Sequence, residues 1–196
     1  MQNIKLRPAA SGDAAAILEI YAPVVRETSA SFEIEPPSIT DMQSRMLTIL
    51  ADYPWLVAEA DSRILGYAYA SRHRPRPAYQ WVVETSVYVH PQARHKGLAT
   101  RMYKALLAIL QLQGFYKAYA VITLPGLSSI GLHESLGFTH FAVYKAVGYK
   151  LNTWHDVGWW ERVLRPAASE PQVPTPFSAL VGSQQIADIL EGESAA

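Results

Sequence analysis

The chain has 196 residues, 49% of them hydrophobic, which suits one compact domain with a substantial core. Lysine plus arginine equals aspartate plus glutamate at 17 each, so no overall charge draws the protein to nucleic acid or an anionic membrane. Cysteine is absent, which excludes an acyl-cysteine intermediate in any transfer chemistry. We therefore expect small-molecule partners, no nucleic acid and no membrane.

The N-terminus carries no basic-then-apolar leader, and no uncharged run approaches the length of a membrane span. Together with the lack of cysteine, this predicts a cytoplasmic protein. We expect residues 1–165 to form the domain and residues 166–196 a proline-containing tail with a short helix. Ile186, Ile189 and Leu190 fall on one face of that helix. Docking on the body, docking on a partner subunit and a frayed terminus are all open for it.

Periodicity in the first third of the chain predicts a strand over residues 4–7 and a helix over residues 14–25, with Asp13 as its cap. A second helix is expected from a cap at Ser38 or Thr40 to Leu50, ended by Pro54. The apolar side of this second helix is formed by Met42, Met46, Leu47 and Leu50.

Strands and helices alternate in the rest of the domain, which makes the fold class α/β. The expected strands cover residues 55–60, 64–71, 79–90, 116–123 and 138–149. The expected helices cover residues 98–112, ended by Gly114, and residues 127–136, ended by Gly137.

A phosphate-binding loop is indicated where the central strand runs into the helix at residue 98. The loop reads Arg94-His95-Lys96-Gly97-Leu98-Ala99, so an arginine, a glycine and a small residue let backbone amides turn toward an anion at a helix N-terminus. It has neither the glycine triplet of dinucleotide-binding loops nor the Gly-Lys-Ser/Thr of nucleotide hydrolases. An ordinary basic strand-to-helix loop is the alternative.

The spacing Arg94-x-x-Gly97-x-Ala99 resembles the coenzyme A pyrophosphate signature of the GNAT acetyltransferase superfamily. Further clusters resemble its phosphinothricin N-acetyltransferase family, and together they span about residues 4–164. These clusters are Thr28-Ser29-Ala30-Ser31-Phe32-Glu33, Gly66-Tyr67-Ala68-Tyr69-Ala70, Ala78-Tyr79 with Trp81, Glu84 within residues 83–89, Leu132-His133-Glu134 with Leu136-Gly137-Phe138, and Val147-Gly148-Tyr149-Lys150 with Trp154-His155-Asp156-Val157.

The resemblance implies a GNAT fold, in which helices flank a bent, mixed and mostly antiparallel sheet. The fourth and fifth strands of that sheet splay apart to admit the pantetheine arm of acetyl-CoA. It also implies a homodimer and acetyl-CoA as the co-substrate. The residues expected to hold acetyl-CoA are Val87, Tyr88, Val89, Arg94, His95, Lys96, Gly97, Leu98, Ala99, Thr100 and Ser129.

Glu84 is the candidate general base. Alternation along the strand puts Val83, Thr85, Val87 and Val89 on one face and Glu84, Ser86 and Tyr88 on the other. A carboxylate in an apolar strand is suited to taking a proton from an ammonium group. A paired glutamate at a strand edge is the alternative.

His133 is the second catalytic candidate, because it lies where many GNAT enzymes carry a tyrosine near the coenzyme sulfur. As an imidazolium it would protonate the departing thiolate, and as a neutral imidazole it would help to deprotonate the amine. A histidine on a helix surface is the alternative. A strand amide near Tyr88 or Val89 is expected to stabilise the oxyanion.

The acceptor substrate is expected beside the loop that follows residue 71. Two guanidinium groups there would hold carboxylate and phosphinate-like oxygens, although a solvated basic loop is an equal alternative. Phe32 and Glu33 are weaker candidates for the border of the same pocket, Phe32 having the core as its alternative. The candidate substrate residues are Tyr69, Arg74, Arg76, Tyr79 and Ser86.

Three further features bear on the site. Gly126 stands where the family has an asparagine after Leu-Pro, so Ser128 or Ser129 would have to supply its hydrogen bond, or cofactor affinity is lower. Trp154, Trp159 and Trp160 are expected to pack the sheet or a dimer surface. The scattered histidines show no paired-ligand spacing, and we expect no metal.

Our leading hypothesis is an acetyl-CoA-dependent N-acetyltransferase that acts, by direct transfer, on the α-amine of a small amino acid or analogue such as phosphinothricin or methionine sulfoximine. One alternative is acetylation of a peptide or protein N-terminus, which Arg74 and Arg76 disfavour. Another is a coenzyme A-binding protein without catalysis. In a fourth, the likeness is one of fold alone and the acyl donor is open.

Overall fold

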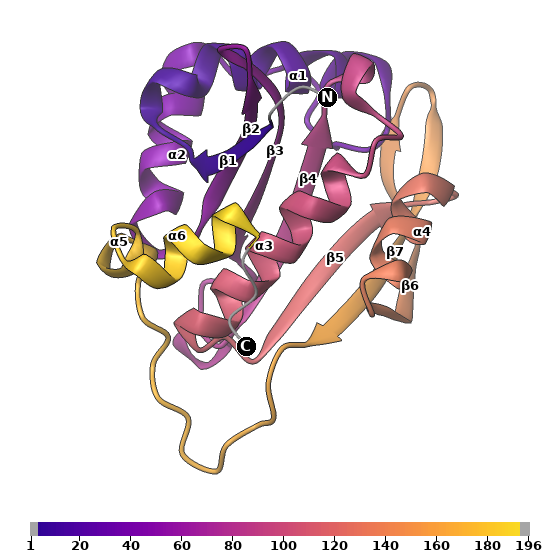
Figure 1. The fold of residues 1–196 in the computed structure, drawn as a ribbon. Helices are drawn as coiled ribbons and strands as arrows, with labels where there is room; N and C mark the ends of the chain where they lie inside the picture. The colour runs from indigo at the N-terminus through magenta and orange to yellow at the C-terminus, as the bar shows by residue number, and fades with distance from the viewer. Residues whose placement is uncertain (1–3, 193–196) are drawn as a thin grey trace.

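The computed structural model describes residues 4–192, which form one seven-stranded sheet with flanking helices (Figure 1). The strands are β1 (Lys5–Pro8), β2 (Trp55–Ala60), β3 (Arg63–Arg72), β4 (Val82–Val89), β5 (Lys117–Thr123), β6 (Thr139–Lys150) and β7 (Thr153–Val163). The helices are α1 (Ala14–Glu27), α2 (Ile39–Asp52), α3 (Leu98–Gln113), α4 (Leu127–Ser135), α5 (Phe177–Leu180) and α6 (Gln184–Glu191), with short turns η1 (Ser11–Asp13), η2 (Pro77–Tyr79) and η3 (Pro91–Ala93).

The sheet opens between β4 and β5. Its order is β1-β2-β3-β4-β5-β7-β6, and the parallel β4–β5 pair is in register over three positions, ending at Glu84↔Tyr119. Beyond Glu84, β4 pairs with β3 on one side only, while Figure 1 shows β5 diverging toward β7 and β6. This confirms the expected mixed, mostly antiparallel sheet with splayed central strands.

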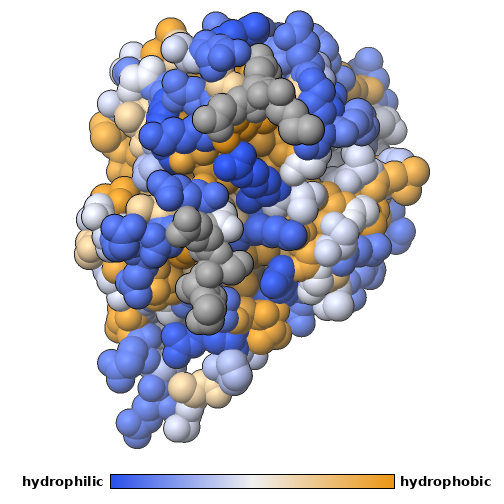
Figure 2. Space-filling model, in the orientation of Figure 1, coloured by the Kyte–Doolittle hydropathy of each residue, from blue (hydrophilic) through white to orange (hydrophobic). Residues whose placement is uncertain are grey.

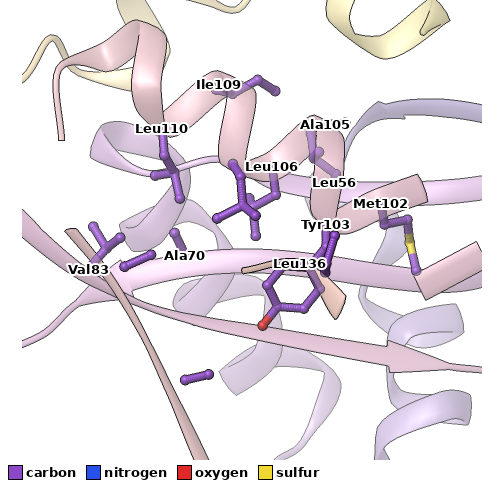
Figure 3. Packing of buried hydrophobic residues seen from close by; sticks show 14 of the residues in the cluster. Leu56, Ala70, Val83, Met102, Tyr103, Ala105, Leu106, Ile109, Leu110 and Leu136 are labelled. Carbon is purple, nitrogen blue, oxygen red and sulfur yellow. The ribbon is translucent and has the colours of Figure 1, made fainter. Parts of the chain in front are cut away.

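The core lies on both faces of the sheet. On one face α3 buries Met102, Leu106, Ile109 and Leu110, whose spacing forms one helical stripe; Figure 3 shows Leu106 and Leu110 pointing from α3 toward the strands. On the other face α1 and α2 bury a second cluster against the aromatic side chains of β2 and β3. This second cluster includes Ile17, Val25, Met42, Met46, Trp55 and Tyr67.

Most elements begin and end within three residues of their expected limits, and the departures have local causes. Of the two expected caps of α2, Ser38 is the one that the structure has, and it accepts a hydrogen bond from the Asp41 N–H. Asp13 makes no side-chain cap on α1, because its carboxylate binds the Ala10 N–H and the Arg7 guanidinium instead. Leu47 was expected on the buried side of α2 but is 61% exposed, since it follows the buried Met46 by one residue and points away.

Two strand assignments also needed correction. β4 starts at Val82 rather than at residue 79, because Pro77 begins a 3₁₀ turn that ends at Tyr79. β7 was not predicted at all. Its central residues 157–160 are buried on both faces of the sheet, so the strand lacks the period-two alternation that reveals a half-buried strand.

The tail docks on the body of its own chain through helices α5 and α6; residues 193–196 lie outside the described residues. Phe177 of α5 is 1% exposed, and α6 buries Ile186 and Leu190 in the same core as α3. Helix α6, capped by the Ser183 hydroxyl, lies across α3 and beside β1 (Figure 1). The tail helices therefore dock on the body of the domain, which was one of the three possibilities left open by the sequence.

Candidate active site

Glu84 stands where β4 and β5 separate, at the last position of their ladder. Its neighbours Val83 and Thr85 are buried on the α3 side, so the Glu84 side chain projects to the opposite face, as the alternation predicts. The side chain is 30% exposed. A partly solvated carboxylate therefore lies at the apex of the opening.

His73 holds this carboxylate. Its Nδ1 lies 2.8 Å from the Glu84 Oε1, and its ring is surrounded by aromatic side chains of three other segments. The ring centroids are 4.8 Å from Tyr119, 5.8 Å from Tyr79 and 6.0 Å from Trp159. His73 was not predicted as a site residue, because it stands in a basic loop between Arg72 and Arg74. The pairing of β3 with β4 would have located it. Ser71 lies opposite Glu84, so His73, two residues further along the chain, comes close to the same carboxylate.

Tyr69 and Ser86, both predicted substrate residues, lie opposite each other on β3 and β4, on the Glu84 side of the sheet. Burial raises the pKa of Tyr69 and outweighs the opposing effect of a hydrogen bond with Ser86. The charges of Arg45 and Glu33, which form a 2.7 Å ion pair, also act on Tyr69. Arg45 was not foreseen, because helix α2 offers no sequence signal that it faces β3.

The loop residues are spread along the rim of this region. Arg74 is exposed with its guanidinium carbon 5.8 Å from the centre of the Trp159 ring, and Arg76 is exposed at the start of η2. Tyr79, 42% exposed, meets the His73 ring edge-on. Phe32 is 40% exposed rather than in the core, and its ring fills the space above Gly148.

His133 lies on the other face of β4, in a buried hydrogen-bonded chain. It is 4% exposed, its Nδ1 donates to the Ser129 carbonyl at 2.7 Å, and its Nε2 is 2.8 Å from the Tyr103 hydroxyl. That hydroxyl also contacts the Thr85 Oγ1 at 3.1 Å, and Thr85 donates to the Tyr119 carbonyl at 3.0 Å. His133 is therefore not the surface histidine that was its alternative.

Burial lowers the pKa of His133 below its ordinary value of 6.5, and the hydrogen bond to Ser129 opposes that effect only in part. The imidazole is accordingly neutral at pH 7. Four hydrogen-bond contacts run from the Ser129 carbonyl to the Tyr119 carbonyl. The side chains between them are those of His133, Tyr103 and Thr85. With a neutral imidazole these supply only three hydrogens for the four contacts. The chain thus has room for one more proton.

The loop before α3 has the geometry of an anion site. Gly97 caps the helix with φ +74°, and His95 also has a positive φ of 58°. The first hydrogen bond of the helix runs from Arg101 to Gly97, so the amides of Leu98, Ala99 and Thr100 have no partner within the helix. The side chains of Arg94, His95 and Lys96 are exposed around them.

The chain is similar to known acetyltransferases both in sequence and in structure. The family described as acetyltransferase (GNAT) domain matches residues 6–159. A phosphinothricin N-acetyltransferase of Streptomyces viridochromogenes is 38% identical over 87% of this chain and 94% of its own. An L-methionine sulfoximine/L-methionine sulfone acetyltransferase of Pseudomonas aeruginosa is 34% identical over 86% of this chain and 99% of its own. A crystal structure of a phosphinothricin acetyltransferase from Sinorhizobium meliloti, in complex with acetyl-CoA, superposes with a TM-score of 0.83 at 38% identity, covering 86% of this chain and 93% of that one.

The chain belongs to the GNAT acetyltransferase family. It is an acetyltransferase, and the resemblance to the phosphinothricin N-acetyltransferases within that family is confirmed. Among residues 4–192 of this acetyltransferase, no group of three or more His, Asp or Glu side chains is arranged to hold a metal ion. Within the same range, no helix combines the length and apolar character needed to cross a bilayer.

Gly126 of the acetyltransferase, which departs from the family asparagine, has a physical reason in this chain. Its φ is +26°, and a Cβ there would come within 2.6 Å of both the Ile122 Cγ2 and the Thr123 carbonyl oxygen. A larger residue would force the start of α4 to move. Ser129, on the first turn of α4, offers its Oγ near His133 Nδ1 at 3.4 Å.

Proposed function

We propose that the protein transfers acetyl from acetyl-CoA directly to the α-amine of a small anionic amino-acid analogue of the phosphinothricin or methionine sulfoximine type. The observation that carries the proposal is the Glu84 carboxylate at the apex of the β4–β5 opening. A general base must be within reach of the amine and open to it, and this carboxylate is partly exposed at the point where the two strands part. The named relatives act on amines of this class.

The opening between the strands suits the donor. Within residues 4–192, residues 85–89 of β4 pair with no strand on the side toward β5, and an extended amide-bearing arm would bond there as an added strand does. At the far end of β4, the amides that open α3 and the exposed Arg94 and Lys96 suit a pyrophosphate. A backbone amide near Tyr88 or Val89 would stabilise negative charge on the thioester oxygen.

Glu84 takes the amine proton in this proposal, directly or through one water. The free amine then attacks the thioester carbon and the C–N bond forms. The C–S bond breaks, and the second proton of the attacking nitrogen passes to the departing sulfur, so that coenzyme A leaves as the thiol. His133 takes part as the neutral imidazole, because burial disfavours its charged form. Its lowered pKa argues against the imidazolium role. We therefore assign it the neutral role, in which Nδ1 donates to the Ser129 carbonyl and Nε2 holds the Tyr103 hydroxyl.

Recognition of the acceptor is assigned to the side of the sheet that carries Glu84. Tyr69 and Ser86 form the floor, and Arg74 and Arg76 stand at the rim with charge for the carboxylate and phosphinate-like oxygens. Both guanidiniums are exposed to a ligand, although that of Arg74 also lies over Trp159 and contacts the His73 carbonyl at 3.4 Å. Acetylation of the α-amine would inactivate such an analogue, so the physiological role of the enzyme would be detoxification.

The test is thiol release from acetyl-CoA with phosphinothricin, methionine sulfoximine, ordinary amino acids and short peptides as acceptors. The chain has no cysteine, so the intact protein gives no thiol background. We expect fast release with the two analogues and a loss of ~100-fold or more in kcat for Glu84→Gln, the range of general-base contributions. Ser71→Ala, at the paired position on β3, is the matched control that leaves the carboxylate in place.

Two results would redirect the assignment. Turnover with peptides alone would make the enzyme an N-terminal acetyltransferase, for which the arginine rim has no evident use. Binding of coenzyme A without turnover of any acceptor, unchanged in Glu84→Gln, would indicate a protein that binds the cofactor without catalysis.

We further propose that the enzyme is a cytoplasmic homodimer joined through the β6–β7 hairpin. β6 is an edge strand with apolar side chains in water, including Phe141 at 50%, Val147 at 51% and Tyr149 at 56% exposure, and Trp154 of β7 is 64% exposed. Figure 2 shows hydrophobic surface on the side of the molecule where α4 and this hairpin lie. Edge strands of this kind are usually covered. Light scattering of the wild type and Trp154→Glu should give a dimer and a monomer.

A further inference from the structure

Among residues 4–192, His73 makes the one side-chain hydrogen bond to the proposed base, and neither the spacing nor the family likeness assigned it to the site. The contact is a 2.8 Å hydrogen bond between Nδ1 and the Glu84 Oε1. Because a carboxylate only accepts hydrogen bonds, the Nδ1 of His73 is the donor. Within residues 4–192, the other Glu84 oxygen, Oε2, has no hydrogen-bond partner, so it remains open to a proton from outside.

The ring that makes this bond is itself held on several sides. The side chain of His73 is 12% exposed and lies among Tyr79, Tyr119 and Trp159. Tyr119 is also the strand partner of Glu84 at the last rung of the β4–β5 ladder. The same residue therefore supports the imidazole and marks the apex of the opening.

We propose that His73 is a positioning residue for the acetyl transfer: its Nδ1–H fixes the rotamer of Glu84, so that Oε1 is occupied and Oε2 faces the incoming amine. The inference rests on the proposed function. His73 transfers no proton in this role; Nδ1 keeps its hydrogen while Oε2 takes one from the ammonium group. A glutamate side chain has three rotatable bonds, and holding it in one arrangement lowers the entropy lost on reaching the reactive geometry.

Two substitutions separate the hydrogen bond from the packing of the ring. His73→Phe keeps an aromatic ring among the three neighbours but has no donor for Glu84. His73→Asn loses the ring, yet its Nδ2–H₂ can occupy the position of the imidazole Nδ1. His73→Phe therefore removes the hydrogen-bond donor and keeps the ring, whereas His73→Asn removes the ring and keeps the donor.

We expect His73→Phe to lower kcat by ~10-fold or more at saturating acetyl-CoA and phosphinothricin, with the KM for acetyl-CoA unchanged. His73→Asn should recover kcat to within ~3-fold of the wild type. Thermal unfolding of both variants checks that they are folded. Equal losses in the two variants, or a loss in His73→Asn with none in His73→Phe, would show that only packing matters and would overturn the proposal.

A second measurement is independent of turnover. In ¹⁵N-histidine-labelled protein, the Nδ1–H signal of His73, assigned by its loss in His73→Phe, should be present in the wild type and lost in Glu84→Leu. A wild-type Nδ1 without a hydrogen, or a signal unaffected by Glu84→Leu, would overturn the positioning role. If the signal behaves as expected while no amine is acetylated, the proposed function fails and the contact stands.

Discussion

Tyr103→Phe tests whether the buried chain from Ser129 to Tyr119 is a connected structure. Tyr103 is fully buried, and its hydroxyl contacts both His133 Nε2 and Thr85 Oγ1. Figure 3 shows that this oxygen points from α3 toward the sheet. The substitution deletes one oxygen and leaves the ring in place, so the changes in packing are small. The buried His133 Nε2 then has no partner.

The expected cost follows from that orphaned nitrogen. A buried polar group left without a partner costs about 1–3 kcal/mol, a large part of the ~5–15 kcal/mol by which a domain is stable. For a chain of this size about 1 kcal/mol corresponds to about 2–4 °C, so Tyr103→Phe should lower Tm by ~2–12 °C. Urea unfolding followed by tryptophan fluorescence gives the same free energy directly.

The matched control and the refuting result use the same assay. Tyr53→Phe removes a hydroxyl that bonds to nothing within residues 4–192, from a ring stacked on Phe115, and should change stability by under about 0.5 kcal/mol. In a His133→Leu background, Tyr103→Phe should cost markedly less than in the wild type, because the lost partner is already gone. Equal costs in the two backgrounds would refute the idea of a connected chain.

Three other perturbations have definite expected results. Because burial lowers the pKa of His133 below 6.5, the unfolded chain binds more protons there as pH falls below that value; the unfolding free energy should therefore drop between about pH 7 and 5, and His133→Gln should flatten that slope in urea titrations. Gly97→Ala meets no neighbouring atom but forces a Cβ into a backbone with φ +74°, so the KM for acetyl-CoA should rise while the KM for the acceptor holds; an unchanged value would count against the loop. Phe177→Ala should destabilise the whole domain by about 3–5 kcal/mol, seen as one cooperative transition at lower urea, whereas a loosely attached tail would leave the midpoint unchanged.

The sequence predicted those parts of the fold whose burial is one-sided. Helix α3 was recognised because its buried residues recur with helical spacing and Gly114 ends it at φ +98°. β4 was recognised because Val83 and Thr85 are buried and Glu84 is not. β7 was missed because its central residues are buried on both faces of the sheet, which removes the alternation on which strand prediction depends.

The site shows the same division between local and long-range information. The position of Glu84 and the turn at Gly97 depend on a few consecutive residues, and both were predicted. His73, Arg45 and Tyr103 approach the site through pairings of β3 with β4, α2 with the sheet and α3 with α4. No property of their own segments distinguishes them from surface or core residues of the same type. Their roles follow only from which elements pack together.

The register of β4 decides which side chain meets the substrate. Glu84 and Thr85 are adjacent, so a slip of one residue would exchange the carboxylate and the hydroxyl between the two faces of the sheet. Aromatic contacts of Tyr88, which shares this face of β4 with Glu84, oppose that slip: its ring lies 5.1 Å from Tyr67 and 5.2 Å from Tyr21. The aromatic side chains of the second core therefore determine on which face of β4 the proposed base lies, and they connect the stability of this face to the geometry of the reaction.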